Sequence, residues 1–165
     1  MDFRIEQRIV SRVDEVARAY VDREMYASLG ELPKVGTPEV LGCEVEGDRA
    51  QLRIQYHFTG HLPAAALAVL DPKKLTWVEE STHDLAAHDV RWLLVPDHYR
   101  DRFRANGTYR FRADGDIVVR EAKGDLVVRT PFVGRVVERA IVSGLREHLA
   151  AEAPLVEAWL AARRR

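Results

Sequence analysis

The sequence has a single cysteine, Cys43, so no disulfide can form within the chain. It has no uninterrupted apolar run of about 18 residues, the length that a membrane-spanning helix needs. Charged residues at positions 2, 4, 6 and 8 interrupt the first stretch, which does not fit a signal peptide. We therefore expect a cytoplasmic protein without integral membrane contact, in which Cys43 serves as a small buried hydrophobic residue.

The sequence also lacks the motifs of the common nucleotide, redox and serine-hydrolase classes. It contains no G-x-G-x-x-G, no P-loop, no C-x-x-C and no G-x-S-x-G. Its formal net charge is −1, so no global field attracts nucleic acid. We expect no cofactor and no nucleic-acid partner, and no residue is assigned a catalytic role. The oligomeric state does not follow from the sequence.

Histidines are the only candidate metal ligands, and their spacing is unfavourable. His83 and His88 fall in or beside a predicted hairpin turn, where we interpret them as solvated. His57 and His61 have the i, i+4 spacing of a zinc site, but this spacing brings two ligands together only on a helix, and Gly60 argues against one there. The sequence therefore predicts no metal site.

One long amphipathic helix is predicted over residues 133–162. Its apolar positions follow helical spacing, and most of its charges fall off the apolar face. The stripe comprises Val133, Val136, Val137, Ala140, Ile141, Gly144, Leu145, Leu149, Val156, Trp159 and Leu160. We expect the helix to continue, kinked, through Pro154, and Ile141, Leu145 and Leu149 to be largely buried.

The region between residues 38 and 130 alternates apolar and polar residues with the period of a β-strand. Strands are predicted at 2–10, 38–46, 49–59, 74–82, 87–95, 105–113 and 116–130, and two short helical pieces follow the first of them. The expected fold is α+β, with a curved antiparallel sheet of about six or seven strands around the long C-terminal helix. At 165 residues, the chain is expected to be a single domain, 1–165.

This order of elements is that of the helix-grip fold, and three segments strengthen the likeness. The segments KLTWVEES (74–81), RWLLVPDHYRDRFRANGTYRFR (91–112) and RTPFVGRVVERAIVSGLREHLAAEAPLVEAWL (129–160) resemble a bacterial START-like family of unknown function. The wider START-like superfamily, also called SRPBCC or polyketide cyclase-like, includes lipid-transfer domains, hormone-binding proteins, polyketide aromatase/cyclases and chaperone activators. The resemblance implies a hydrophobic cavity between sheet and helix, without implying a reaction.

Aromatic residues on the inner faces of the predicted strands are either core or cavity lining. Glu79 shares their face, in phase with Trp77. Three interpretations of this carboxylate remain open: it is solvated where the strand twists outward, paired with Arg91 or Arg120, or a polar anchor for a ligand. The candidate ligand-binding residues are Tyr56, Phe58, Trp77, Glu79, Trp92, Tyr109 and Phe111 on the strands and Ile141, Gly144 and Leu145 on the helix.

The favoured function is the binding of a hydrophobic or amphipathic, lipid-like small molecule between the sheet and the helix. Because Gly144 has no side chain to fill the space opposite, we expect an apolar cavity on the order of a few hundred Å3. The first alternative is an enzyme of the polyketide cyclase/dehydratase type that uses the same pocket. The second is a protein-interaction module with a filled core.

Metal removal should leave the protein unchanged, because the His pairs lack the preorganised tetrahedral geometry that binds zinc. The melting temperature is expected to be the same with and without a chelator. Stoichiometric zinc that co-purifies with the protein, and is lost in a His83→Ala/His88→Ala double variant, would contradict this prediction.

Overall fold

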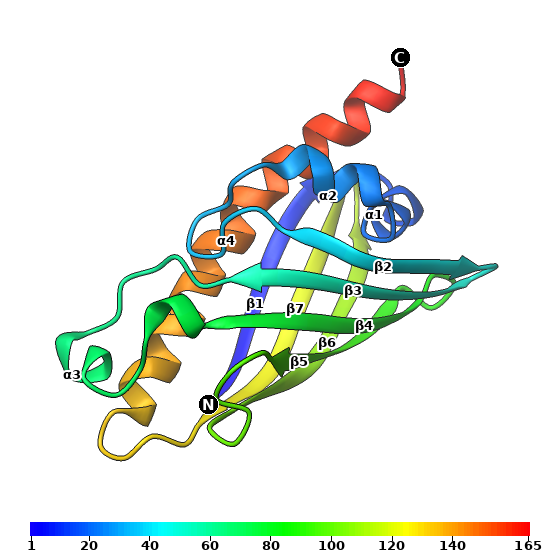
Figure 1. The fold of residues 1–165 in the computed structure, drawn as a ribbon. Coiled ribbons are helices and arrows are strands. Elements are labelled where there is room, and N and C mark those ends of the chain that lie inside the picture. Colours follow the sequence, from blue (N-terminus) through cyan, green and yellow to red (C-terminus); the bar gives the residue numbers. More distant parts are fainter.

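A computed structural model describes residues 1–165 and shows one curved antiparallel sheet that wraps around a long helix (Figure 1). The seven strands lie in the order β1-β7-β6-β5-β4-β3-β2. They are β1 (Asp2–Val10), β2 (Glu39–Glu46), β3 (Arg49–His57), β4 (Thr76–Asp84), β5 (Asp89–Pro96), β6 (Phe103–Asp114) and β7 (Ile117–Val128). The helices are α1 (Val13–Ala19), α2 (Arg23–Leu29), α3 (Ala64–Leu67), the 3-10 turn η1 (Pro72–Lys74) and α4 (Gly134–Arg163). The predicted α+β helix-grip arrangement is confirmed.

The helix α4 continues through Pro154, as expected, but its buried face differs in detail from the predicted stripe. Val137 and Val156 are fully buried, and Leu149 is nearly so. Ile141 and Leu145 are only half-buried, because they face a space between helix and sheet rather than packed core. Val136 was predicted to lie on the stripe, yet it is 40% exposed, because it flanks the contact face.

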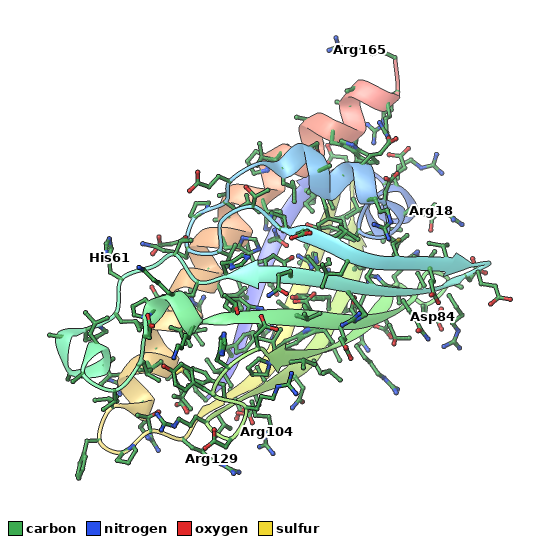
Figure 2. All side chains as sticks on the ribbon, viewed as in Figure 1. Arg18, His61, Asp84, Arg104, Arg129 and Arg165 are labelled. Carbon is green, nitrogen blue, oxygen red and sulfur yellow. The ribbon has the colours of Figure 1, made fainter.

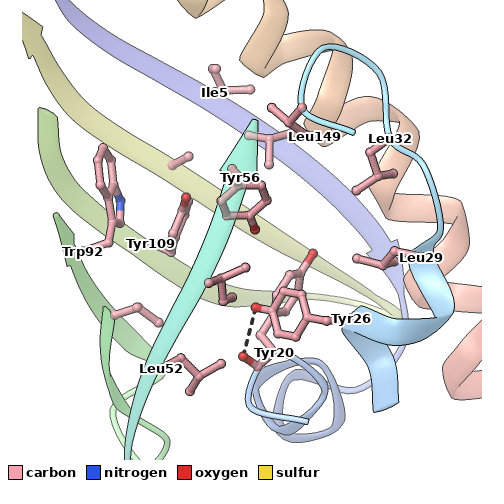
Figure 3. Close-up of a cluster of buried hydrophobic side chains, with 14 of the residues drawn as sticks. Ile5, Tyr20, Tyr26, Leu29, Leu32, Leu52, Tyr56, Trp92, Tyr109 and Leu149 are labelled. Carbon is pink, nitrogen blue, oxygen red and sulfur yellow. Dashed lines mark hydrogen bonds between the residues drawn. The ribbon is translucent and has the colours of Figure 1, made fainter. Parts of the chain in front are cut away.

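The short helices α1 and α2 cover the end of the sheet that lies beside the C-terminal half of α4 (Figure 1). Asp22 caps α2 by accepting a hydrogen bond from the backbone N–H of Glu24 at 2.8 Å. Tyr20 and Tyr26 from this region are buried, and the Tyr26 hydroxyl donates to the Tyr20 carbonyl (Figure 3). The groove between sheet and α4 is therefore closed at this end by side chains of α1 and α2.

The inner surface of the sheet is shaped by an indole ring that lies over two glycines. Gly107 of β6 and Gly124 of β7 face each other in the strand register. A Cβ atom added to either would come within 2.7 Å of the Trp92 ring. The phenyl ring of Phe3 also lies over Gly124 and stacks on the Trp92 ring at 6.2 Å between ring centroids. The glycines thus let Trp92 lie flat against the backbone and form part of the cavity wall.

No helix in the structure combines the length and the apolar character that a bilayer crossing requires.

Neighbouring valines of α4 provide a matched test of the packing. Val137→Asp should unfold the domain, because an unpaired carboxylate in the core costs about 4 kcal/mol or more. Val136→Asp places the same charge on the exposed side and should leave the melting temperature within a few degrees. Equal melting temperatures for the two variants, measured by circular dichroism, would be incompatible with this orientation of α4.

Candidate functional site

A cavity of about 90 Å3 lies between the concave face of the sheet and the middle of α4. Its walls come from β1 and β3 to β7, from α4 and from the segments around Tyr20, Tyr26 and Lys34. A second cavity of about 60 Å3 adjoins it toward the start of β4 and is lined mostly by apolar side chains. The two share a wall that consists of Phe58, Trp77, Leu94, Ala105, Leu126 and Ile141.

Nine of the ten residues that the sequence indicated line the first cavity. They are Tyr56, Phe58, Trp77, Glu79, Trp92, Tyr109, Ile141, Gly144 and Leu145. Phe111 does not line it, although it shares the inner face of β6 with Tyr109. Phe111 packs instead against the ring of Tyr20, with 5.6 Å between the two ring centroids. The sequence pattern identified the correct face of the strand but could not show that α1 covers its far end.

The space opposite Gly144 is filled, contrary to the expectation from sequence. The Cβ and Cγ atoms of Lys34 lie 3.2 and 3.3 Å from the place that a Cβ of residue 144 would take. Lys34 crosses the helix there and reaches Glu147 with its amine at 3.5 Å. The cavity, at about 90 Å3, is smaller than the predicted few hundred Å3, and Lys34 occupies part of the space that was expected to be empty.

A buried ion pair between Arg120 of β7 and Glu152 of α4 forms one wall of the cavity. Arg120 Nη1 lies 3.2 Å from Glu152 Oε1 and donates to Gln7 Oε1 at 2.7 Å. Gln7 in turn donates to the Leu149 carbonyl at 2.6 Å and to Glu152 at 3.3 Å. Arg120 and Glu152 are 7% and 2% exposed, so this network is shielded from bulk water. The two opposite charges pair with each other, and the buried Arg120 Nε is the one atom of the guanidinium without a hydrogen-bond partner that is shielded from water.

Aromatic rings enclose the Arg120 guanidinium on both sides. Its Cζ atom lies 4.0 Å from the centroid of the Tyr20 ring and 3.9 Å from that of Tyr109. The Tyr20 hydroxyl donates to Glu152 Oε1 at 2.5 Å. Burial lowers the pKa of Arg120, but Tyr20, Glu152, Tyr109 and Tyr26 together raise it more, so the net shift is upward and Arg120 stays charged.

Glu79 is the acidic group of the cavity that has no cation of its own. Tyr109 donates a hydrogen bond to Glu79 Oε2 at 3.1 Å. Burial raises the pKa of Glu79 to about 7, although the charge of Arg120 and the Tyr109 hydrogen bond lower it. Arg91, one of the two proposed partners, is exposed on the outer face of β5, and Arg120 is engaged with Glu152. Glu79 therefore faces the cavity as a carboxyl group poised between its two protonation states.

Two buried histidines complete the polar groups of this region. His148 of α4 lines the cavity with its Nε2 atom 3.4 Å from Glu152 Oε2, and burial lowers its pKa. His83 was predicted to be solvated in a turn, which is wrong: it lies on the inner face of β4, 4% exposed, with Nε2 2.9 Å from Ser81 Oγ. Burial lowers the pKa of His83 to about 4. His88 is in the turn, as expected, and contacts Asp14.

Sequence reasoning missed most of this polar network. Tyr20, Gln7, His148 and Glu152 were not identified, and Arg120 was considered only as a partner of Glu79. A signal existed for the two helix residues, since positions 148 and 152 follow Leu145 and Leu149 at helical spacing. Polar residues at such positions on an apolar helix face mark the polar end of this cavity.

The site does not offer a metal centre. No group of three or more His, Cys, Asp and Glu side chains is arranged to hold an ion. The two histidines that come nearest the cavity belong to different elements and each contact one oxygen atom. What the arrangement can do is bind an uncharged or weakly polar group beside Glu79 and exchange a proton with it.

Solved structures of very different sequence share this fold. TTHA0849 from Thermus thermophilus is 20% identical, with 100% of both chains covered and a TM-score of 0.68. Zhui aromatase/cyclase from Streptomyces sp. R1128 is 14% identical over 100% of this chain and 96% of that one, with a TM-score of 0.65. Norcoclaurine synthase from Thalictrum flavum, in complex with dopamine and hydroxybenzaldehyde, is 18% identical. The match covers 100% of this chain and 88% of the synthase chain, with a TM-score of 0.65. The predicted START-like fold is confirmed.

A comparison with curated protein sequences gives no match. A family profile described as "Protein of unknown function (DUF2505)" matches residues 4–160, nearly the whole chain. The chain therefore belongs to the DUF2505 family, and that family has the START-like helix-grip fold in this member.

Proposed function

We propose that the protein binds a small amphipathic molecule in the cavity, with its polar group beside Glu79 and its apolar part toward the second cavity. The observation that carries the proposal is the combination of aromatic walls with one buried carboxyl group that lacks a counter-ion. A ligand hydroxyl or amine would satisfy that group, whereas the charges of the neighbouring Arg120 and Glu152 already pair with each other.

The cavity volume favours a compact ligand over a long acyl chain. Drug-sized ligands occupy pockets of about 300–1,000 Å3, and a cavity of about 150 Å3 is known to hold benzene. The two cavities measure about 90 and 60 Å3 and are separated only by side chains that line both. Ile141 and Trp77, which line both cavities, are only half-buried. We infer that a single aromatic ring with a polar substituent fits, and that the lipid-like ligand considered from sequence does not.

The fold comparisons support small-molecule binding in general. Neighbours include an aromatase/cyclase and a synthase with two small molecules bound. Their sequence identities are below 25%, so neither their substrates nor their reactions transfer to this chain.

Proton transfer on the bound molecule is the second candidate function, of the polyketide cyclase/dehydratase type. It is favoured by the environment of Glu79, whose pKa of about 7 suits a general acid or base at neutral pH. Tyr109, which donates to it, could relay a proton. Consumption of an offered polyketone, lost in Glu79→Gln, would select this function over binding alone.

Phenol is a suitable probe for the binding function. We expect it to perturb the NMR signals of residues around the cavity and to raise the melting temperature, because a ligand that binds only the native state stabilises it. Ile141→Trp should fill the wall shared by the two cavities and abolish both effects. Val136→Trp puts the same side chain on the exposed side of α4 and should bind phenol as the wild type does.

Native mass spectrometry of the freshly purified protein would identify any molecule that already occupies the site. If no molecule co-purifies and neither phenol nor other single-ring compounds bind, the interaction module with a filled core replaces this proposal. Equal binding of phenol to Ile141→Trp and wild type would place the ligand elsewhere.

The protonation of Glu79 gives a pH-dependent prediction. Between the ordinary carboxyl pKa of 4.5 and the folded value of about 7, the native protein holds a proton that the unfolded chain has released. The free energy of unfolding therefore falls as the pH rises through this window. Relative to Glu79→Gln, the wild type should become less stable from pH 4.5 to about 7 and level off above it. Denaturant unfolding at several pH values measures this difference.

Glu80→Gln is the matched control for this measurement. Glu80 is the next residue of β4, points to the outer face and contacts Arg53 at 3.3 Å. The stability difference between wild type and Glu80→Gln should stay level over the same window. If the stability difference between wild type and Glu79→Gln also does not change with pH, Glu79 titrates as an ordinary solvated carboxyl.

A further inference from the structure

The sheet splits between β5 and β6 near the second cavity. The ladder between these strands ends at the pair Leu94–Ala105. Beyond it, Pro96 stays paired with β4 and Phe103 with β7, and residues 97–102 connect the two diverging ends. The split leaves a gap in the hydrogen-bonded sheet at a place where the inner face carries a cavity.

A surface hollow of about 440 Å3 lies at this split and is rich in arginine. Arg100, Arg102, Arg104 and Arg129 line it, together with one acidic residue, Asp101. Figure 2 shows Arg104 and Arg129 near each other at this end of the molecule. The one ion pair formed by these arginines joins Arg104 to Asp125 at 3.9 Å, and the other three have no carboxylate within 4.0 Å. The hollow therefore carries uncompensated positive charge.

The backbone fixes two of these like charges opposite each other. The Arg129 N–H donates to the Arg102 carbonyl at 2.7 Å, which places the two residues across from one another at the end of β6 and β7. Directly opposed like charges destabilise a sheet. Arg102 also lies over the Tyr99 ring, at 5.4 Å from its centroid, and Arg100 donates to the Pro96 carbonyl at 3.0 Å. Arg100 and Arg102 are thus held in place by contacts that do not neutralise their charges.

The hollow and the second cavity share part of their lining. Leu94, Pro96, Phe103 and Arg104 contribute to both. These residues stand on the two sides of the split, so a molecule that lies in the cavity would have its outer end beside the guanidinium groups. Two other surface hollows of similar size carry fewer cations, one with Arg53 and Arg91 and the other with Arg4 and Lys123.

We propose that the arginine hollow binds a phosphate group, and that this group is the outer end of a ligand whose ring enters the cavity through the split. The entry of the ring into the cavity rests on the proposed function. Guanidinium groups form paired hydrogen bonds with phosphate oxygens, and several of them match the double negative charge of a phosphate ester. The acidic residue at the rim favours a single phosphate over an extended polyanion.

Inorganic phosphate tests the hollow independently of the cavity. NMR titration of the full chain at low ionic strength should show saturable binding that weakens at least tenfold in Arg102→Ala/Arg129→Ala. The control Arg8→Ala/Arg112→Ala removes the same net charge from the outer face, where both residues lie across from Val119. It should bind phosphate within twofold of the wild type. Equal loss in both double variants, or equal binding in all three proteins, overturns the proposal.

Phenyl phosphate tests the connection between hollow and cavity. The wild type should bind it at least tenfold more tightly than phenol, and Arg102→Ala/Arg129→Ala should abolish this advantage while still binding phenol. If phosphate binds, phenol does not bind and phenyl phosphate binds no more tightly than phosphate, the proposed function fails and the anion site stands. If phenol binds and phosphate contributes nothing, the anion site fails alone.

A phospholipid headgroup also presents a phosphate group, on a membrane surface. Binding to vesicles distinguishes a lipid phosphate from a soluble phosphate ester. Sedimentation with phosphatidylglycerol vesicles, compared with phosphatidylcholine vesicles, should show no retention that depends on Arg102 and Arg129. Vesicle retention through these two arginines, together with no binding of phenyl phosphate, would overturn the assignment to a soluble phosphate ester.

Discussion

The buried ion pair between Arg120 and Glu152 is the interaction on which the rest of the structure depends. It joins β7, the strand next to the β1 edge of the sheet, to α4, and it draws in Gln7 from β1 and Tyr20 from the end of α1. Removing one member of such a pair leaves an uncompensated charge and costs about 3–5 kcal/mol. The pair therefore sets the separation of helix and sheet. Because the charge of Glu152 is paired with that of Arg120, Glu79 is the one acidic group of the cavity without a counter-ion.

The fold and the general position of the site could be predicted from sequence because both follow from periodicity. Alternation identified the inner faces of the strands, and helical spacing identified α4, so nine of ten candidate residues line the cavity. Properties that depend on contacts between distant residues could not be predicted. Lys34 fills the space beside Gly144 from a loop with no recognisable pattern, and α1 covers Phe111. His83 looked like a turn residue because its neighbours are polar, yet it belongs to the inner face.

The two ends of the groove differ in character. Helices α1 and α2 close one end with buried tyrosines, whereas the other end meets a divided sheet and a set of arginines. The interior runs from the polar wall around Glu79 and Arg120 to the apolar wall around Leu94 and Ile141. The groove thus has a direction, and an asymmetric molecule would be held in one orientation. Volume limits the size of that molecule, and the polar groups determine which end of it lies deepest.

The contact of Trp92 with Gly107 and Gly124 has an evolutionary consequence. A side chain at either glycine would collide with the indole, and a smaller residue at position 92 would leave bare backbone in the wall. These three positions, which come from three adjacent strands, can change only together. Relatives that keep all three should share the shape of this wall, and relatives that have replaced them should have remodelled the cavity. A family whose members bind different molecules could then be divided into groups by these three residues alone.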